Sequence, residues 1–151
     1  SLLSALQSGK CAAYATDFPS DEMLCAGNVI PLPHLGASTP ESEDNCAQMA
    51  VDQIKEYIEN GNIINSVNLP NLSMAREPGT RRICVIHRNV PGAIADFTSV
   101  CGRAGINIEN MQSKSRGDYA YTVLDVTGGD VSHAVRELST LEADIRVRVI
   151  D

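Results

Sequence analysis

Two hydrophobic periodicities alternate in a fixed order through the second half of the chain, and this order restricts the fold more than any other feature. Four stretches alternate apolar and polar residues and are rich in β-branched residues, as strands are. Two others space their apolar residues for one face of a helix. The expected elements are a strand at 81–88, a helix at 91–104, strands at 106–115 and 119–128, a helix at 131–141 and a strand at 143–151.

This order, βαββαβ within about 70 residues, is that of the ferredoxin-like arrangement. It predicts a four-stranded antiparallel sheet with both helices packed on one face. The same fold serves many functions, so the function has to come from particular residues.

The loop HRNVPGAI (87–94) joins the first of these strands to the first helix. The first N–H groups of a helix have no partner within it, and the positive end of the helix dipole lies there. A carboxylate is therefore a natural ligand in front of this loop. Asn89 can both donate and accept hydrogen bonds, which suits an amino-acid zwitterion. Asn107, at the start of the next strand, offers a second amide.

The first half of the chain has the pattern of a parallel α/β fold that is cut short. Its apolar stretches suit buried parallel strands, and a Pro followed by several acids begins a long helix. Two short strands and two helices cannot bury their own apolar faces. Residues 1–67 are therefore interpreted as part of a doubly wound, Rossmann-like sheet. The expected elements are a helix at 1–9, strands at 11–19 and 29–33, a helix at 40–60 and a strand at 62–70.

The charge changes between the two halves. Residues 1–75 carry two Lys and nine acids, whereas residues 76–151 carry ten basic and ten acidic side chains. The stretch NLPNLSMAREPGT (68–80) contains two Pro and a Gly, and it is interpreted as a linker between domains at 1–67 and 81–151.

Composition limits the partners and the compartment. With 43% apolar residues the chain is globular, and no apolar run reaches the roughly 20 residues of a membrane span. A formal charge of −7 with no Trp and only two Phe argues against nucleic acid as a partner. The five Cys form no CxxC pair, which argues against a metal site, and their apolar neighbours suit free thiols in a reducing cytoplasm.

The second half resembles an ACT domain, the amino-acid-sensing module of many biosynthetic enzymes. The resemblance covers all of 81–151: a strand, then N-x-PG, a helix, "AGINIENM", a third strand, a helix and a closing strand. It is most similar to the serine-sensing domains of phosphoglycerate dehydrogenases, which carry a histidine, an asparagine two residues later, PG, and a later asparagine. The effector-binding residues that this implies are His87, Asn89, Pro91, Gly92 and Asn107.

Domains of this family usually pair edge to edge and bind their effector between two copies. The resemblance therefore implies two partners, a second copy of the chain and a small amino acid, with L-serine favoured over glycine. An alternative remains open, in which Pro91 and Gly92 serve only the turn geometry and the half only pairs subunits. His87 has an alternative as well, because a histidine at a strand end is often merely solvated.

The first half resembles the closing part of the D-isomer-specific 2-hydroxyacid dehydrogenases. The residues that carry this resemblance are LLSALQSGK, DFP and NVIPLPHLGASTPESEDN, and the NSVNLP that follows is typical of the phosphoglycerate dehydrogenases within that family. The histidine of the H-[LIV]-G-[AG]-[ST] motif matches His34. In the family this histidine is the acid/base that takes the proton from the substrate hydroxyl, a task that suits the pKa of imidazole.

The resemblance implies further roles around His34. The carboxylate that orients the histidine is expected a few residues after D-x-F, and the shortened TDFPSDEM segment leaves Asp21 and Glu22 as alternatives. Asp17 matches an acid near the nicotinamide, and Gly36 and Ala37 would pass close to the cofactor.

The cofactor, NAD, is expected only in a longer parent enzyme. The chain has no glycine-rich phosphate loop, no ribose-binding acid after it and no arginine for the substrate carboxylate. We therefore expect the 151 residues alone to bind no NAD and to be inactive. The alternative is a free-standing ACT protein that binds an amino acid or pairs subunits and has no enzymatic activity.

Overall fold

The computed structural model describes all residues, 1–151. The chain divides into two compact units, Ser1–Gln48 and Met49–Asp151, which are described separately. The division between the units falls inside the helix α3 (Pro40–Asn60). The domain boundaries expected from the sequence, 1–67 and 81–151, stay a prediction. None of the helices combines the length and the apolar character that crossing a membrane requires.

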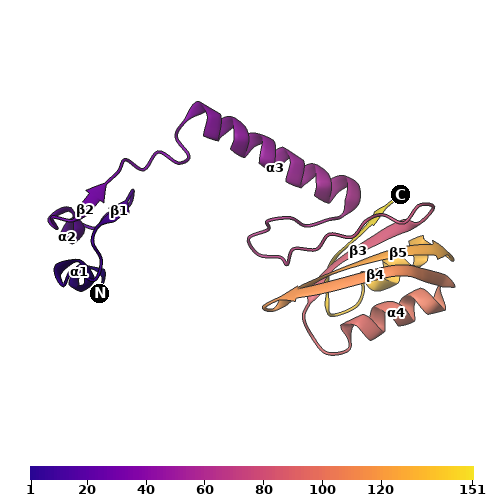
Figure 1. Ribbon diagram of the computed structural model, residues 1–151. Helices are drawn as coiled ribbons and strands as arrows, with labels where there is room; N and C mark the ends of the chain where they lie inside the picture. The colour runs from indigo at the N-terminus through magenta and orange to yellow at the C-terminus, as the bar shows by residue number, and fades with distance from the viewer. The chain divides into compact units, whose positions relative to one another are not determined.

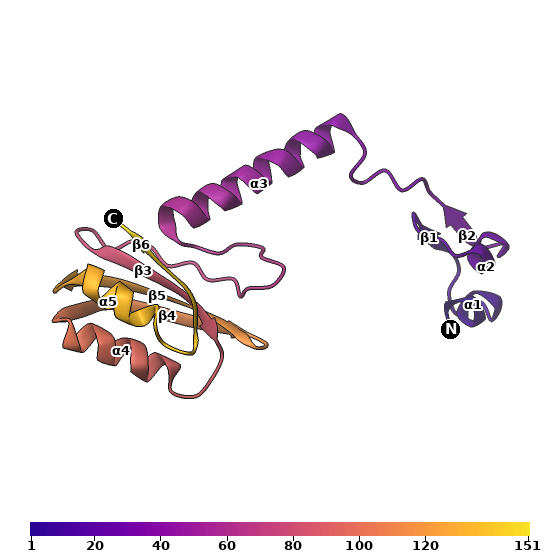
Figure 2. The same cartoon turned by 180° about the vertical axis from the view of Figure 1, so that it is seen from behind.

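The second unit has the ferredoxin-like fold that the sequence predicts. Its sheet has the order β4-β5-β3-β6 with every neighbouring pair antiparallel, and the helices α4 and α5 lie on one face of the sheet (Figures 1 and 2). The elements are β3 (Arg81–Arg88), α4 (Ala93–Arg103), β4 (Ile106–Arg116), β5 (Tyr119–Gly128), α5 (Val131–Leu138) and β6 (Asp144–Ile150).

Both helices are shorter than expected. Helix α4 begins after Pro91 because Gly92, with φ +89°, takes the cap position in a left-handed conformation. Helix α5 ends at Leu138, and two further turns of chain lead to β6. These differences of two or three residues leave the buried faces as predicted.

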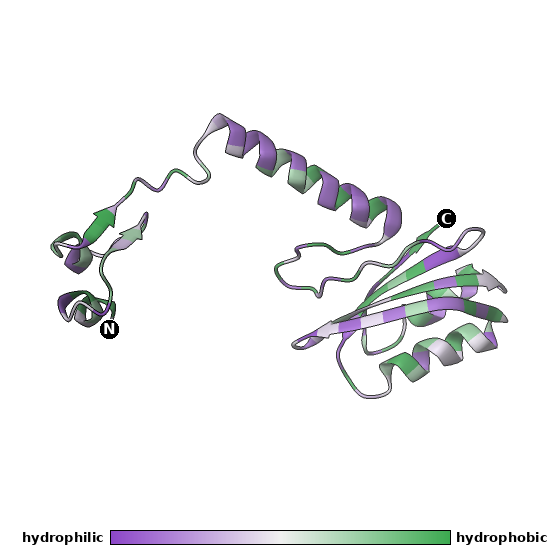
Figure 3. Ribbon diagram, in the orientation of Figure 1, coloured by the Kyte–Doolittle hydropathy of each residue, from purple (hydrophilic) through white to green (hydrophobic).

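The core between sheet and helices consists of the residues whose spacing predicts it. Ile83, Val85, Leu124, Phe97 and Leu138 are fully buried there. The hydropathy colouring shows the contrast with the edge of the sheet, since β4 is banded with purple and white (Figure 3). The inner strands β3 and β5 are therefore the ones around which the unit is packed.

The outer face of the sheet is covered by residues 61–75. Leu72 and Met74 are buried against Cys84 and Tyr121, although the stretch 68–80 has the composition of a linker. The strand expected at 62–70 does not form, and the only pairing is an isolated bridge between Ile63 and Leu72. The chain reverses between these two residues, so it crosses the sheet as an irregular strap rather than as a strand.

A buried arginine fixes this strap. Arg82 and Asp125 are both fully buried and form a two-pronged ion pair, with Nε–Oδ1 at 2.6 Å and a second bond to Oδ2 at 2.7 Å. The remaining N–H groups of Arg82 donate to three carbonyl oxygens, those of Asn60, Met74 and Ala75. All five donors of the guanidinium are therefore satisfied.

The same face holds the last turn of α3. Tyr121 donates its hydroxyl to the carbonyl oxygen of Gly61 at 2.6 Å, and Arg148 donates to that of Tyr57 while its guanidinium lies 4.2 Å from the Tyr57 ring. Gly61 has φ +72°, and a Cβ there would lie 2.5 Å from the Cys84 sulfur. The end of α3 is thus attached to the sheet by side chains of three strands.

The first unit contains α1 (Leu2–Gln7), β1 (Tyr14–Thr16), α2 (Asp21–Leu24) and β2 (Val29–Pro31). The two strands pair in parallel, as expected of a piece of a doubly wound sheet. Leu6 is its only buried residue, and Phe18 is 83% exposed. The expectation that this half cannot bury its own faces is confirmed, whereas its covering by a second chain stays a prediction.

The apolar stripe of α3 is exposed as well. Met49, Ile54 and Ile58 are each more than half exposed in the second unit. A cavity of about 530 Å³ lies between the last turns of the helix and residues 62–69, with Ile54 and Tyr57 in its wall.

We expect Arg82→Met to destabilise the second unit by about 3–5 kcal/mol, because it leaves the Asp125 carboxylate buried without its partner. Arg81→Ala is the matched control, since Arg81 pairs with the exposed Asp151 and should contribute less than about 1 kcal/mol. Urea unfolding measures both values, and equal losses in the two variants would contradict the assignment.

Candidate functional site

The loop after β3 is held in place by the hairpin between β4 and β5. The backbone N–H of Asn89 donates to the carbonyl oxygen of Asp118 at 2.9 Å, and its side chain donates to that of Gly117 at 3.2 Å. Asn89, Pro91 and Gly92 are exposed. No side chain caps the first turn of α4, so its free N–H groups and the Asn89 amide oxygen are open to a ligand.

His87, in contrast, is a core residue. Its side chain is buried, and its ring packs edge-on against Phe97 with centroids 4.8 Å apart. Nδ1 lies 2.8 Å from the carbonyl oxygen of Arg88, and Nε2 lies 2.9 Å from the Thr122 hydroxyl. Burial lowers the pKa of His87, more than its hydrogen bond to Arg88 raises it.

The partners of His87 define the direction of its hydrogen bonds. A carbonyl oxygen only accepts, so Nδ1 carries the proton and the neutral Nε2 accepts from Thr122. Thr122 then accepts from Ser113, whose hydroxyl lies 2.7 Å away. Both ring nitrogens of His87 already have hydrogen-bond partners, and the ring is buried. An effector would therefore contact the exposed loop beside His87 more readily than the imidazole itself. Its predicted role as an effector contact stays a prediction.

Asn107 lies at the other end of the sheet. It pairs with Thr127 in the β4–β5 register, whereas the Asn89 loop contacts the hairpin tip at the far end of both strands. The Asn107 side chain donates to Glu109 Oε1 at 2.8 Å. Bonds from Thr127 and from Asn107, in that order of effect, lower the pKa of the exposed Glu109. One copy of the chain therefore does not bring Asn89 and Asn107 together.

The strand β4 is an open edge of the sheet. It is the longer of the two edge strands, with eleven residues, and it pairs only with β5. Most of its residues after Ile108 are exposed, and the register shifts between Ile108 and Asn110, which marks a bulge. Its second row of backbone groups is free to pair with another strand.

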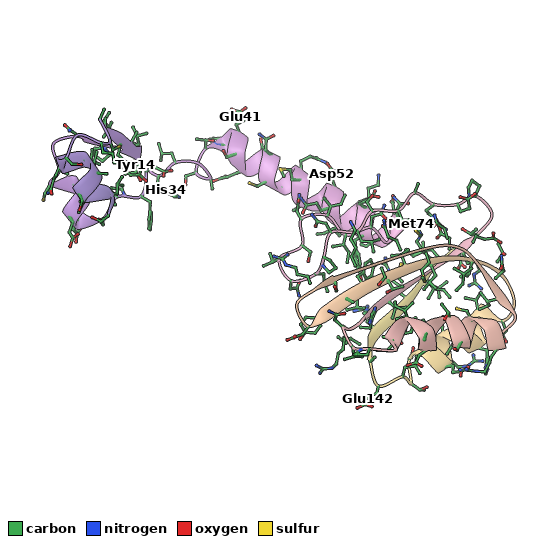
Figure 4. All side chains as sticks on the ribbon, turned by 60° about the horizontal axis from the view of Figure 1, so that its bottom comes forward. Tyr14, His34, Glu41, Asp52, Met74 and Glu142 are labelled. Carbon is green, nitrogen blue, oxygen red and sulfur yellow. The ribbon has the colours of Figure 1, made fainter.

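In the first unit the structure brings His34 and Asp17 together. The parallel strands β1 and β2 carry these residues just beyond their carboxyl ends, so both lie at the same edge (His34 is labelled in Figure 4). His34 Nδ1 lies 3.5 Å from Asp17 Oδ2 and 3.2 Å from the Asp17 carbonyl oxygen. The side chains are 63% and 53% exposed, so the pair is open to solvent.

Asp21 and Glu22, the predicted partners of His34, do not contact it. They form the first turn of α2, where their negative charges interact favourably with the positive end of the helix dipole. The carboxylate beside His34 is instead Asp17, which precedes them and directly follows β1.

The residues expected near a cofactor lie in an exposed loop. Gly36 and Ala37 are both exposed, and a Cβ at Gly36 would meet nothing within 4 Å. The Gly36 carbonyl oxygen accepts a bond from Ser42 at 2.9 Å. Their predicted place beside a cofactor stays a prediction.

Comparison with known proteins identifies a domain within the second unit. Residues 82–143 match the model of the ACT domain family, and they therefore form an ACT domain. The ACT domain of the GTP pyrophosphokinase of Chlorobium tepidum is 12% identical, with a TM-score of 0.42 over 47% of this chain and 96% of that one.

The chain as a whole is similar to D-3-phosphoglycerate dehydrogenases. That of Haemophilus influenzae is 31% identical over 160 residues, which cover 99% of this chain and 39% of the relative. A putative one from Schizosaccharomyces pombe is 30% identical over 99% of this chain and 37% of the relative. That of Escherichia coli K12 is 28% identical over 87% of this chain and 33% of the relative. The chain thus spans about two fifths or less of the relatives' length.

Burial of His87 predicts a pH dependence. Its pKa is lowered in the folded chain, so the unfolded chain binds the proton more tightly, and the stabilisation present above about pH 6.5 is lost as the pH falls. We expect the stability difference between the wild type and His87→Gln to shrink between about pH 7.5 and pH 5.5. Urea unfolding at several pH values measures it.

Two features sharpen this test. Burial raises the pKa of Asp144 to about 6, which acts in the opposite sense, so the effect is read as a difference between variants. His133→Gln removes a histidine with a 58% exposed side chain and serves as the control. A pH-independent difference for His87→Gln would contradict the assignment.

Proposed function

We propose that the chain is the C-terminal part of an NAD-dependent 3-phosphoglycerate dehydrogenase of serine biosynthesis, working in the cytoplasm. Two features support this, in the order that such an enzyme requires. The first is the pairing of His34 with an acid at the edge of a parallel strand pair, and the second is the ACT domain that follows. Similarity to dehydrogenases over 87–99% of the chain supports the same assignment.

In the parent enzyme His34 would accept the proton of the substrate hydroxyl. Asp17 lies 3.5 Å from its Nδ1, which leaves Nε2 for the substrate, and its carboxylate would stabilise the imidazolium. Asp21 and Glu22 remain the alternative orienting acids if the parent's other segments reorganise this loop. NAD would supply the redox chemistry, with Gly36 and Ala37 contributing one edge of its site, and the 151 residues alone should be inactive.

The ACT domain would pair with a second copy through β4 and bind L-serine between the two. The observation that carries this is the separation of Asn89 and Asn107 at opposite ends of the sheet. Antiparallel pairing of two β4 edges about a twofold axis reverses one copy, which brings Asn107 of one toward the loop end of the other. A site that uses both asparagines therefore requires two copies.

The chemistry of the loop suits an amino acid. The uncapped first turn of α4 would receive the carboxylate, with Pro91 and Gly92 shaping its approach. The Asn89 amide and Asn107 of the second copy would bond the ammonium and the hydroxyl. His87 would support the loop through Arg88 or contact the ligand after exchanging one of its bonds.

Calorimetric titration with L-serine, beside glycine and L-alanine, tests this proposal. We expect saturable binding of L-serine that Asn89→Ala and Asn107→Ala each weaken about tenfold or more, as expected for hydrogen bonds to a charged ligand. Asn71→Ala, which changes an exposed asparagine outside the site, is the control.

Mixing the two asparagine variants tests whether the site is shared. In a mixed dimer one interface site has both asparagines and the other has neither, so a one-to-one mixture should regain about a quarter of the sites. Binding that does not recover on mixing, in chains shown by sedimentation to be dimeric, would place both residues in one copy's site and overturn the proposal.

A free-standing ACT protein is the second candidate. Its support is the completeness of the Met49–Asp151 unit, whose sheet is covered on one face by two helices and on the other by residues 61–75. The intact mass of the protein from its native source separates the candidates. A parent of roughly 300 residues or more fits the dehydrogenase, and a mass near that of this chain fits the alternative.

A further inference from the structure

The turn between α5 and β6 (139–143) leads into a buried acid. Asp144 is the first residue of β6, and both of its carboxylate oxygens are shielded from solvent, although the residue as a whole is only partly buried. Neither oxygen has a hydrogen-bond partner in the protein. A buried carboxylate without a partner is costly in its ionised form. Neither the His34 site nor the Asn89 loop makes use of this group.

The uncharged side chains next to Asp144 offer it no hydrogen bond. Leu141 and Ala143, which precede it, pack against the hydrophobic core. A small cavity of about 70 Å³ lies beside Asp144, and the one hydroxyl in its wall, that of Ser139, donates to the carbonyl oxygen of Val135 at 2.8 Å. The Ser139 hydrogen is therefore not available to the carboxylate.

No cation neutralises Asp144 either. His87 is its partner in the β3–β6 register, but the imidazole is neutral, and its one N–H donates to the carbonyl oxygen of Arg88. The ion pairs of the chain do not include Asp144. The charged and titratable groups on the elements around it are His87 and Arg88 of β3, Asp96 of α4, His133, Arg136 and Glu137 of α5, Glu142 of the turn (labelled in Figure 4) and Arg146 of β6.

Two backbone hydrogen bonds keep the turn closed over Asp144. The N–H of Asp144 donates to the carbonyl oxygen of Leu141 at 3.0 Å, and the N–H of Arg88 donates to that of Ala143 at 2.8 Å. The register of β3 and β6 shifts just before His87. These bonds lie at the end of an edge strand, where local opening costs less free energy than in the centre of a sheet. The turn can therefore open while the rest of the sheet stays folded.

We propose that this turn is a proton-dependent switch within the ACT domain. It stays closed while Asp144 is protonated, and ionisation of Asp144 shifts it toward an open form in which the carboxylate is in water. Opening breaks the bond between Arg88 and Ala143, so it loosens the end of β3 and the start of β6 together. The switch requires no ligand and no second copy, so it is independent of the proposed amino-acid site.

The direction of the switch follows from the burial of the carboxylate. Burial raises the pKa of Asp144 to about 6, from an ordinary value of 3.8. The closed form therefore binds the proton more tightly than the open form does, and acidic pH favours it. The closed form loses this advantage as the pH rises through about 6, and the loss is complete at higher pH. The turn should therefore open most often at neutral pH and above.

Hydrogen exchange of the whole chain, followed by NMR, tests the switch. The probes are the backbone N–H groups of Arg88 and of residue 144, whose exchange rates relative to free peptides give the opening constant of the turn. We expect the ratio of this constant in the wild type to that in Asp144→Asn to rise about tenfold between about pH 5 and about pH 7.5, because asparagine cannot ionise. Titration of His87 is common to both proteins and cancels from the ratio. Asp144→Ala, which removes the buried polar group altogether, is a second reference.

Two comparisons make the outcome decisive. Glu142→Gln removes an exposed carboxylate from the same turn, and it should keep the pH dependence of the wild type. The N–H of Leu124, in the centre of β5, exchanges only when the whole unit unfolds, and it should exchange about tenfold or more slowly than that of Arg88 near neutral pH. Thermal unfolding verifies that each variant is folded. The proposal is overturned by a ratio that does not change with pH, by a pH dependence that Glu142→Gln removes, or by equal opening constants at Arg88 and Leu124.

Discussion

The burial of one guanidinium determines how the second unit is assembled. Arg82 has no access to water, so each of its five N–H groups needs an acceptor inside the protein. Asp125 supplies two bonds from the neighbouring strand, and the other three come from carbonyls of residues 60, 74 and 75. The strap cannot move away from the sheet without leaving part of this charge unsatisfied. A segment with the composition of a linker is therefore part of the folded unit.

The end of α3 depends on the same arrangement. The last carbonyls of a helix have no partner within it, and they lie at the negative end of its dipole. Here those of Tyr57, Asn60 and Gly61 receive bonds from two arginines and a tyrosine of the sheet. The helix that begins just after the His34 loop thus ends on the ACT domain through charged and polar contacts.

Periodicity was sufficient to predict the ACT half because its elements bury faces that repeat along the sequence. It failed at Leu72 and Met74, which are buried against Cys84 and Tyr121 of the sheet although their own stretch of sequence has no strand or helix periodicity. Arg and Asp side chains usually lie at the surface, so the sequence pattern did not predict that Arg82 and Asp125 are buried. The acid beside His34 was missed for a similar reason: Asp17 reaches it because β1 and β2 run in parallel, and only the fold shows that.

The strap has a consequence for how copies of this chain can associate. With helices on one face and residues 61–75 on the other, the sheet has no bare face on which a second sheet could stack. Another strand can be added to this sheet only at its two edge strands, β4 and β6. The pairing through β4 proposed above would therefore extend the sheet in its own plane, and the pair would form one continuous eight-stranded layer with a loop exposed at each side of the seam.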